Sequence, residues 1–208
     1  MRKYFILLVS FYTILSNSES FAVSEVFIQR HSGKVYDASR AVSKEQIDAM
    51  IQAARWAPSS HNDQPWNFIF CEHSTTPEAY NKALSCLKEK SRNWAKNAPL
   101  LILIVARTQL SHKYQGKLNK WAQYDTGAAA ISMALQATDL GLMAHQIGGF
   151  DKEKAKLEFQ LPENCIPMAM MVVGYEGAET NLPPKLRVRD PIEKNFFLGK
   201  WGCGISNP

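Results

Sequence analysis

Two apolar segments constrain the fold of this chain more than any other feature of its sequence. They are Leu100–Val105 and Pro167–Tyr175, and neither alternates apolar with polar residues. A run without alternation is typical of a strand that is covered on both faces, because an exposed face would carry polar side chains at every second position. The sequence therefore predicts two strands in the interior of a sheet.

Helical patterns lie between and beyond these strands. Ser43 and Gln46 match a capping box, and apolar residues recur at helical spacing after them, which predicts a helix over Lys44–Trp56. A long segment over 121–142, rich in Ala and other small residues, predicts a central helix packed closely on several sides. Weaker patterns predict helices over 79–90 and from 151 onward, and strands over 66–70 and 144–147.

The order of these elements bears on domain organisation. Strands and helices alternate irregularly, and the 208 residues contain neither an internal repeat nor an interdomain linker. From 182 to 208 the chain is Pro-rich and basic, and it has no periodicity of its own. We therefore expect one α+β domain over residues 23–208, ending in an extended C-terminal tail.

The first 22 residues resemble a targeting segment. Arg2 and Lys3 precede the apolar run Tyr4–Leu15, which is shorter than the roughly 20 residues needed to cross a bilayer. Ser20 and Ala22 supply small residues for cleavage after position 22. The sequence thus predicts a signal peptide over 1–22 and a periplasmic or secreted protein without stable membrane insertion. The alternative is a misplaced start and a cytoplasmic protein.

Charge and cysteine content exclude several classes of protein. The formal net charge of +5 is modest, and the sequence lacks the dense basic stripe of a nucleic-acid-binding protein. The histidines show no ligand pair at helical or hairpin spacing, so no metal site is expected. The cysteines are far apart and form no CxxC, which favours isolated thiols, although export would permit a disulfide. They are Cys71, Cys86, Cys165 and Cys203.

Three separate segments carry polar groups suited to one ligand. Arg30–Lys34 places two cations around a hydroxyl, which suits a phosphate but also fits an exposed basic turn. Ala57–Phe68 is dense in small polar residues, and the carboxamide of Asn62 could pair with an imide edge, although a plain polar loop looks similar. Gly148 and Gly149 would let backbone N–H groups approach a flat ring. The tail residues Lys185–Arg189, counted with the glycine turn Gln146–Asp151 as the third segment, add further cations.

Taken together, these segments resemble the FMN-dependent nitroreductase family. Its motifs occur in order as RHSGKVYD from Arg30, APSSHNDQPWNF from Ala57, DTGAAAISMALQATDLGL from Asp125, QIGGFD from Gln146 and VVGY from Val172. The resemblance implies a three-layer sandwich, with a central mixed, mainly antiparallel sheet flanked by helices. It also implies an obligate homodimer whose two FMN sites lie at the interface, each lined by both subunits.

The resemblance further implies roles for individual residues. Phosphate contacts are expected from Arg30, His31, Ser32, Arg187 and either Lys185 or Arg189. Lys34 would lie near the N1 and O2 edge of the flavin, and the Gly148 N–H would face N5. The remaining cofactor contacts would come from Pro58, Ser59, Ser60, Asn62, Gln146, Ile147 and Gly149.

The expected activity is hydride transfer from NAD(P)H through bound FMN to a nitroaromatic, quinone or similar flat acceptor, in a ping-pong cycle. Since the flavin carries out the chemistry, no side chain is named as catalytic. Two alternatives stay open: the same fold with other flavin chemistry, such as a dehydrogenase, oxidase or dehalogenase, and a flavin-binding module without turnover. The short segment between Phe70 and Ala98, where longer relatives carry extra helices, leaves the acceptor pocket undetermined.

Overall fold

The computed structural model describes residues 23–178 and 188–205. The expected signal peptide, 1–22, and the predicted phosphate ligands Lys185 and Arg187 lie outside the described residues. Within the described part of the chain, no helix is long and apolar enough to cross a membrane.

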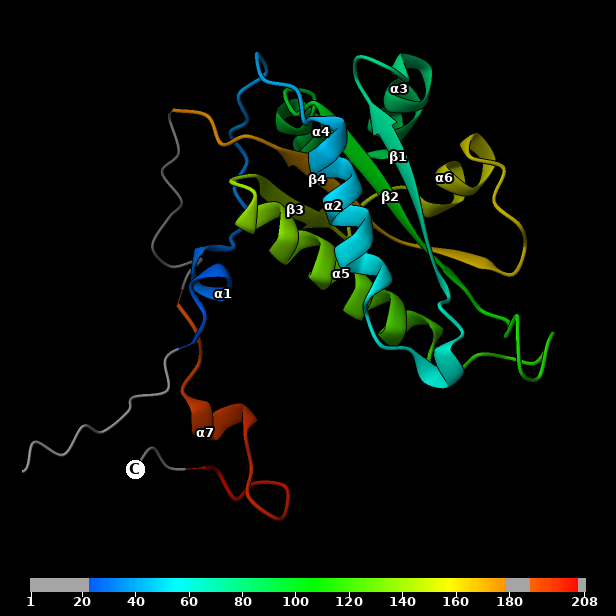
Figure 1. Ribbon diagram of the computed structural model, residues 1–208, viewed down its shortest axis with the longest axis vertical. Coiled ribbons are helices and arrows are strands. Elements are labelled where there is room, and N and C mark those ends of the chain that lie inside the picture. Colours follow the sequence, from blue (N-terminus) through cyan, green and yellow to red (C-terminus); the bar gives the residue numbers. More distant parts are fainter. Residues whose placement is uncertain (1–22, 179–187, 206–208) are drawn as a thin grey trace, which may run out of the picture.

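A single four-stranded sheet forms the centre of the molecule. Its strand order is β1 (Trp66–Glu72), β2 (Leu100–Arg107), β4 (Cys165–Gly174) and β3 (Met143–Ile147), as Figure 1 shows. The two apolar runs thus occupy both central positions, as predicted. Each pair of neighbouring strands among the described residues is antiparallel, so a parallel component of the expected mixed sheet is not found there.

Helices cover both faces of this sheet, which confirms the α+β sandwich (Figure 1). On one face lie α2 (Lys44–Arg55) and the long central α5 (Ala122–Asp139). The opposite face carries α3 (Pro77–Cys86), α4 (Glu89–Ala95) and α6 (Lys152–Glu158).

The core is divided by the sheet. Along β2, Leu101, Leu103 and Val105 belong to the cluster under α3, α4 and α6, whereas Leu100 and Ile102 belong to the cluster under α2 and α5. Side chains that alternate between two apolar clusters explain why the strand shows no polar alternation in its sequence.

Local sequence signals account for several element ends. The predicted capping box of α2 is present: Ser43 Oγ accepts from the Gln46 amide at 3.2 Å, and Gln46 Oε1 accepts from the Ser43 amide at 3.0 Å. The prediction of one helix over 79–90 is wrong in its C-terminal part. The structure has two helices there, α3 and α4, which are separated by the extended residues Leu87 and Lys88. Leu87 is 1% exposed and forms a β-bridge with Phe150, so burial of its side chain interrupts the helix.

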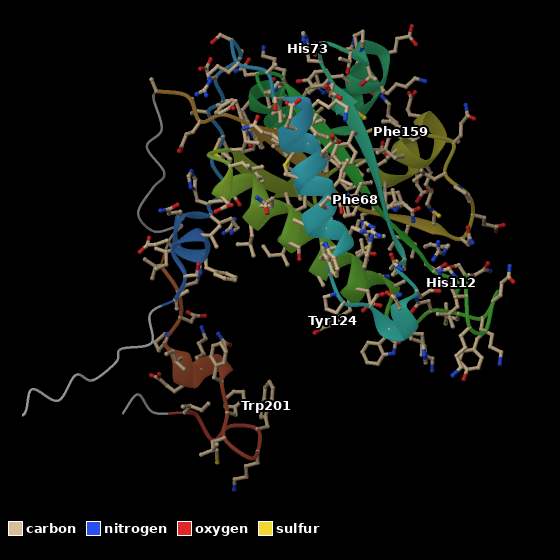
Figure 2. The ribbon with its side chains drawn as sticks, viewed as in Figure 1. Phe68, His73, His112, Tyr124, Phe159 and Trp201 are labelled. Carbon is tan, nitrogen blue, oxygen red and sulfur yellow. The ribbon has the colours of Figure 1, made fainter. Side chains whose placement is uncertain are left out.

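Three short elements complete the described chain: α1 (Glu25–Gln29), the 3-10 helix η1 (Ser60–Asn62) and α7 (Ile192–Asn195). The segment 188–205, which contains α7, extends away from the sheet (Figure 1). It exposes Phe196 and Trp201, and Trp201 is labelled in Figure 2. All four cysteines are free thiols, in agreement with their spacing in the sequence.

Candidate functional site

The predicted phosphate segment and the predicted glycine turn lie side by side. His145, on β3, forms a hydrogen bond of 2.8 Å between its Nδ1 and the carbonyl oxygen of Gly33. Because a carbonyl only accepts, Nδ1 carries the proton. The bond joins the segment Arg30–Lys34 to the strand that leads directly into Gly148. Two of the three segments singled out in the sequence therefore meet, although they are more than 100 positions apart.

His145 is also fixed by its surroundings. Its ring centroid lies 4.8 Å from that of Trp94 on α4. Burial lowers the pKa of His145; the bond to Gly33 opposes this, and the charges of Lys34 and Arg30 lower the pKa further. The imidazole is therefore held neutral, with its proton directed at the Gly33 carbonyl. Sequence inspection did not single out His145 or Trp94.

Gly33 is required by close packing. A Cβ atom built on Gly33 would lie 2.2 Å from the Sδ atom of Met143, well inside van der Waals contact. Any side chain at this position would displace Met143, whose 4% exposure shows that it has little room to move. The phosphate segment is thus held against β3 by packing as well as by a hydrogen bond.

The side chain of His31 has partners within the protein. Its Nε2 lies 2.8 Å from Glu176 Oε1, and its Nδ1 lies 2.9 Å from the Gln29 carbonyl oxygen. Both ring nitrogens are therefore occupied by oxygen atoms of the protein. His31 is therefore bound to a carboxylate, and its contact with phosphate stays a prediction.

The glycine turn has an open surface. Cβ atoms built on Gly148 and Gly149 would meet nothing within 4 Å, and both residues are exposed. Gln146 is exposed as well, whereas Ile147 is buried in the core with 7% exposure. Accessible backbone of this kind can contact a flat ring without interference from side chains. The geometry fits a flavin, with Ile147 supporting the turn from beneath.

The second half of the candidate site is a tight turn that begins after Pro58. His61, Asn62 and Gln64 have φ values of 57°, 53° and 49°, in the left-handed region that non-glycine residues rarely adopt. Residues held in this conformation occur preferentially at functional sites, where the surrounding structure must fix them.

Two side-chain contacts hold this turn. Ser59 Oγ accepts from the Gln64 amide at 3.0 Å, and Asp125 Oδ2 on α5 accepts from the Ser60 amide at 3.0 Å. Asp125 is 4% exposed, so its carboxylate is directed inward at the turn and not at solvent. The carboxamide of Asn62 is exposed and makes no side-chain hydrogen bond with any described residue.

A buried network anchored on Asp63 follows the turn. One oxygen accepts from the amide of Ser111 at 2.8 Å, and the other accepts from Arg107 and Asn119 at 3.2 Å each. His112 donates its amide at 3.4 Å. Burial alone would raise the pKa of Asp63, but hydrogen bonds from Ser111 and Arg107 outweigh burial and lower it. The network fixes the loop after β2 to the turn, and no local sequence pattern predicts it.

The two halves of the site lie at opposite ends of α5. Thr138 lines a cavity with His31 and Met143 at one end, and Asp125 binds Ser60 at the other. Thr138 and Asp125 are 13 positions apart, which at 1.5 Å per residue is about 20 Å. This separation exceeds the length of FMN between its phosphate and its pyrimidine edge. Within the described chain the two halves are therefore separate.

Arg189 lies in the C-terminal segment. It is exposed, and its guanidinium donates to the carbonyl of the neighbouring Val188 at 3.2 Å. The described residues thus bring together Arg30–Lys34 with Gln146–Gly149, and separately organise Pro58–Asn62.

Comparison with known proteins agrees with this fold. Residues 28–175 match the sequence profile of the Nitroreductase family. A protein of Archaeoglobus fulgidus, provisionally named NADH dehydrogenase/NAD(P)H nitroreductase, is 31% identical over 154 residues, covering 72% of this chain and 83% of the relative.

Solved structures give the same result. An oxidoreductase described as containing FMN has a TM-score of 0.78 and 29% identity, covering 88% of this chain and 95% of its own. A nitroreductase family protein from Clostridium difficile 630 has a TM-score of 0.69 and 28% identity, covering 85% and 97%. Since the family profile spans the sheet, its helices and both halves of the site, the chain belongs to the nitroreductase family of oxidoreductases.

Proposed function

We propose that this protein binds FMN and transfers a hydride from NAD(P)H to a nitroaromatic, quinone or similar flat acceptor, in a ping-pong cycle. The observation that carries the proposal is the bond between His145 and Gly33, which sets a basic segment beside an open glycine turn. FMN, when bound, supplies the hydride chemistry that no side chain provides.

The residues present are suited to hold such a cofactor. Arg30 and Ser32 offer charge-assisted and neutral donors to a phosphate, and Lys34 follows directly after the anchored Gly33. A cation at the pyrimidine edge of the ring would stabilise the negative charge gained on reduction, which is the role proposed for Lys34. Gly148 and Gly149 offer accessible backbone to the ring.

Both substrates are expected to use the same open face in turn. For a nitroaromatic, NAD(P)H and one proton convert Ar–NO2 to Ar–NO and water, leaving NAD(P)+. For a quinone, the same hydride and proton give the hydroquinone.

A homodimer is part of the proposal, because the two halves of the site are too far apart within one chain. Exposed apolar side chains support it: Tyr124 and Ile131 lie at helical spacing on the outer face of α5, and they are 76% and 41% exposed. Figure 2 shows Tyr124 at the end of α5 nearest the turn. In the C-terminal segment, Phe196 and Trp201 are 59% and 89% exposed, and large apolar surfaces of this kind mark interaction sites.

The absorbance of the purified protein tests the function directly. We expect flavin bands that bleach on anaerobic addition of NADH and return when acceptor is added. Bound flavin that NADH does not bleach would favour a non-catalytic flavin-binding module, and bleaching without transfer to nitroaromatics or quinones would favour other flavin chemistry.

Affinity for FMN tests the phosphate assignment. Losing a hydrogen bond to a charged group costs about 1.5 to 3 kcal/mol, so Arg30→Ala should weaken FMN binding roughly tenfold or more. Arg55→Ala, on the exposed end of α2, is the matched control. Wild-type protein that binds riboflavin as tightly as FMN would refute the assignment.

A further inference from the structure

A cavity beside the turn Ser60–His61 is not used by the proposed function as stated. It has a volume of about 160 Å³ and lies between this turn and the loop over residues 108–121, named here the basic loop. Leu110, Leu118 and Trp121 give it apolar walls, and Lys120 gives it a charge. Since an apolar cavity of about 150 Å³ accepts benzene, a single substituted aromatic ring fits here.

The exposed charge around this cavity has one sign. From Lys90 to Tyr124 the sequence contains no acidic residue. Lys113, Lys117 and Lys120 form no ion pair with any residue in the described ranges, so their charge is available to a ligand. The nearest carboxylates, Asp63 and Asp125, are buried and bind donors of their own, as described above. The exposed charged side chains around the cavity are therefore cationic.

Aromatic side chains accompany this charge. The ring of Tyr114, at the tip of the basic loop, meets the ring of His61 edge to face at a centroid distance of 5.6 Å. The ammonium groups of Lys113 and Lys117 each lie 5.3 Å from the centroid of Tyr114. Trp121 is 58% exposed at the cavity wall. A flat anionic ligand could therefore stack on an aromatic ring and pair with a cation at this cavity.

The basic loop is held in place by hydrogen bonds to the rest of the protein. Asp63 holds Ser111 and Asn119, which lie near the two ends of the loop, by the buried hydrogen bonds described above. Figure 2 shows His112 on this loop, next to the turn. The cavity therefore keeps a constant position relative to Ser60, one of the residues proposed to contact the flavin.

From these observations we infer that the cavity selects the electron acceptor by charge: the preferred acceptor is a planar aromatic ring carrying a carboxylate or another anionic substituent. Lys120 holds the anionic group, and the faces of Trp121 and the neighbouring aromatics hold the ring. Lys120 is a specificity-determining residue in this arrangement. The inference rests on the proposed function, because it places the cavity next to the flavin through Ser60.

Paired acceptors of nearly equal shape test the inference on the FMN-loaded protein. We expect kcat/KM for 4-nitrobenzoate to exceed that for neutral 4-nitrobenzamide by about tenfold, the value of one charge-assisted hydrogen bond. The preference should fall as salt is raised, because the charges around the cavity are close to solvent. Equal kcat/KM for the two acceptors would overturn the inference and leave the flavin chemistry intact.

Two variants test whether the preference for the carboxylate arises at the cavity. Lys120→Gln should remove most of the preference for the carboxylate by lowering kcat/KM for 4-nitrobenzoate far more than for 4-nitrobenzamide. Lys82→Gln, which changes an exposed lysine on α3 across the sheet, should keep the preference. As a second measurement that needs no reduction of the ligand, benzoate should inhibit the wild type more strongly than benzamide, and Lys120→Gln should abolish the difference.

The phosphates of NAD(P)H are also anions, so the cations could serve the electron donor instead of the acceptor. Measuring the two half-reactions separately distinguishes these roles. Stopped-flow reduction by NADH should be the same in Lys120→Gln and wild type, and only reoxidation by 4-nitrobenzoate should slow. An effect confined to reduction by NADH would overturn the inference, because the cations would then serve the donor. A protein that binds no FMN would overturn the proposed function itself.

Discussion

The buried carboxylate of Asp63 permits the most quantitative prediction. Asp63→Asn preserves size and shape but leaves one acceptor oxygen where there were two. If that oxygen keeps the Ser111 amide at 2.8 Å, the new amide group faces two donors, on Arg107 and Asn119, at 3.2 Å each. Hydrogen bonds to a charged group are worth about 1.5 to 3 kcal/mol, and breaking a buried ion pair costs about 3 to 5 kcal/mol.

Because Arg107 keeps other acceptors and remains 25% exposed, the low end of this range applies. We expect Asp63→Asn to lower the free energy of unfolding by about 3 kcal/mol, a large share of the roughly 5 to 15 kcal/mol of an ordinary domain. Urea denaturation measures the change. Asp139→Asn, at the exposed end of α5, is the control and should stay within about 0.5 kcal/mol of wild type.

The pH dependence of this difference has a definite sign. The pKa of Asp63 is lower in the folded protein than its ordinary value of 3.8. Its contribution to stability is therefore complete above that value and is lost as the pH falls toward the folded pKa. The gap between wild type and Asp63→Asn should shrink as the pH falls below about 4. A gap below about 1 kcal/mol at neutral pH, or one that does not change with acidification, would refute the reasoning.

Three further predictions concern the other half of the site and the thiols. His145→Phe keeps the ring beside Trp94 but loses the bond to Gly33, so FMN binding should weaken about fivefold, for the roughly 1 kcal/mol of a neutral hydrogen bond; unchanged affinity in a fluorescence titration would argue against the anchoring role. Gly33→Ala should lower stability by about 1 to 3 kcal/mol through overpacking, and Met143→Ala in the same chain should recover part of the loss; strictly additive effects in the thermal unfolding of the double variant would contradict the close contact. Burial raises the pKa of Cys71 to about 12, so iodoacetamide should label the partly exposed Cys203 first, and mass spectrometry that finds Cys71 labelled as fast in the native protein would contradict this.

The sequence predicted the parts of the fold that depend on neighbouring residues. The capping box at Ser43 and the uninterrupted run from Leu100 each determine a local conformation, and the structure has both elements where they were expected. The end of the helix before Leu87 was wrong because a distant contact with Phe150 decides it.

The candidate site shows the same division. The residue types at Arg30–Lys34 and Gln146–Gly149 were singled out from the sequence, and the family resemblance assigned them to the cofactor. The groups that position the site were not identified. His145 donates a hydrogen bond to the Gly33 carbonyl, and Asp63 accepts one from the Asn119 side chain. Histidine and aspartate are common in loops and strands, and their role becomes visible only when the fold brings their partners together.

The division of the core by the sheet has a consequence for how the protein tolerates mutation. Met143 and Ile147, beneath the phosphate half of the site, belong to the cluster on one face, whereas Ala57, which leads into the turn, belongs to the cluster on the other. In the proposed dimer each flavin would then be bound by residues that rest on one face of the sheet in one chain and on the other face in its partner. A chain defective at Arg30 and a chain defective at Ser60 should therefore complement each other when mixed, since half of the sites in a hybrid dimer would receive both intact halves.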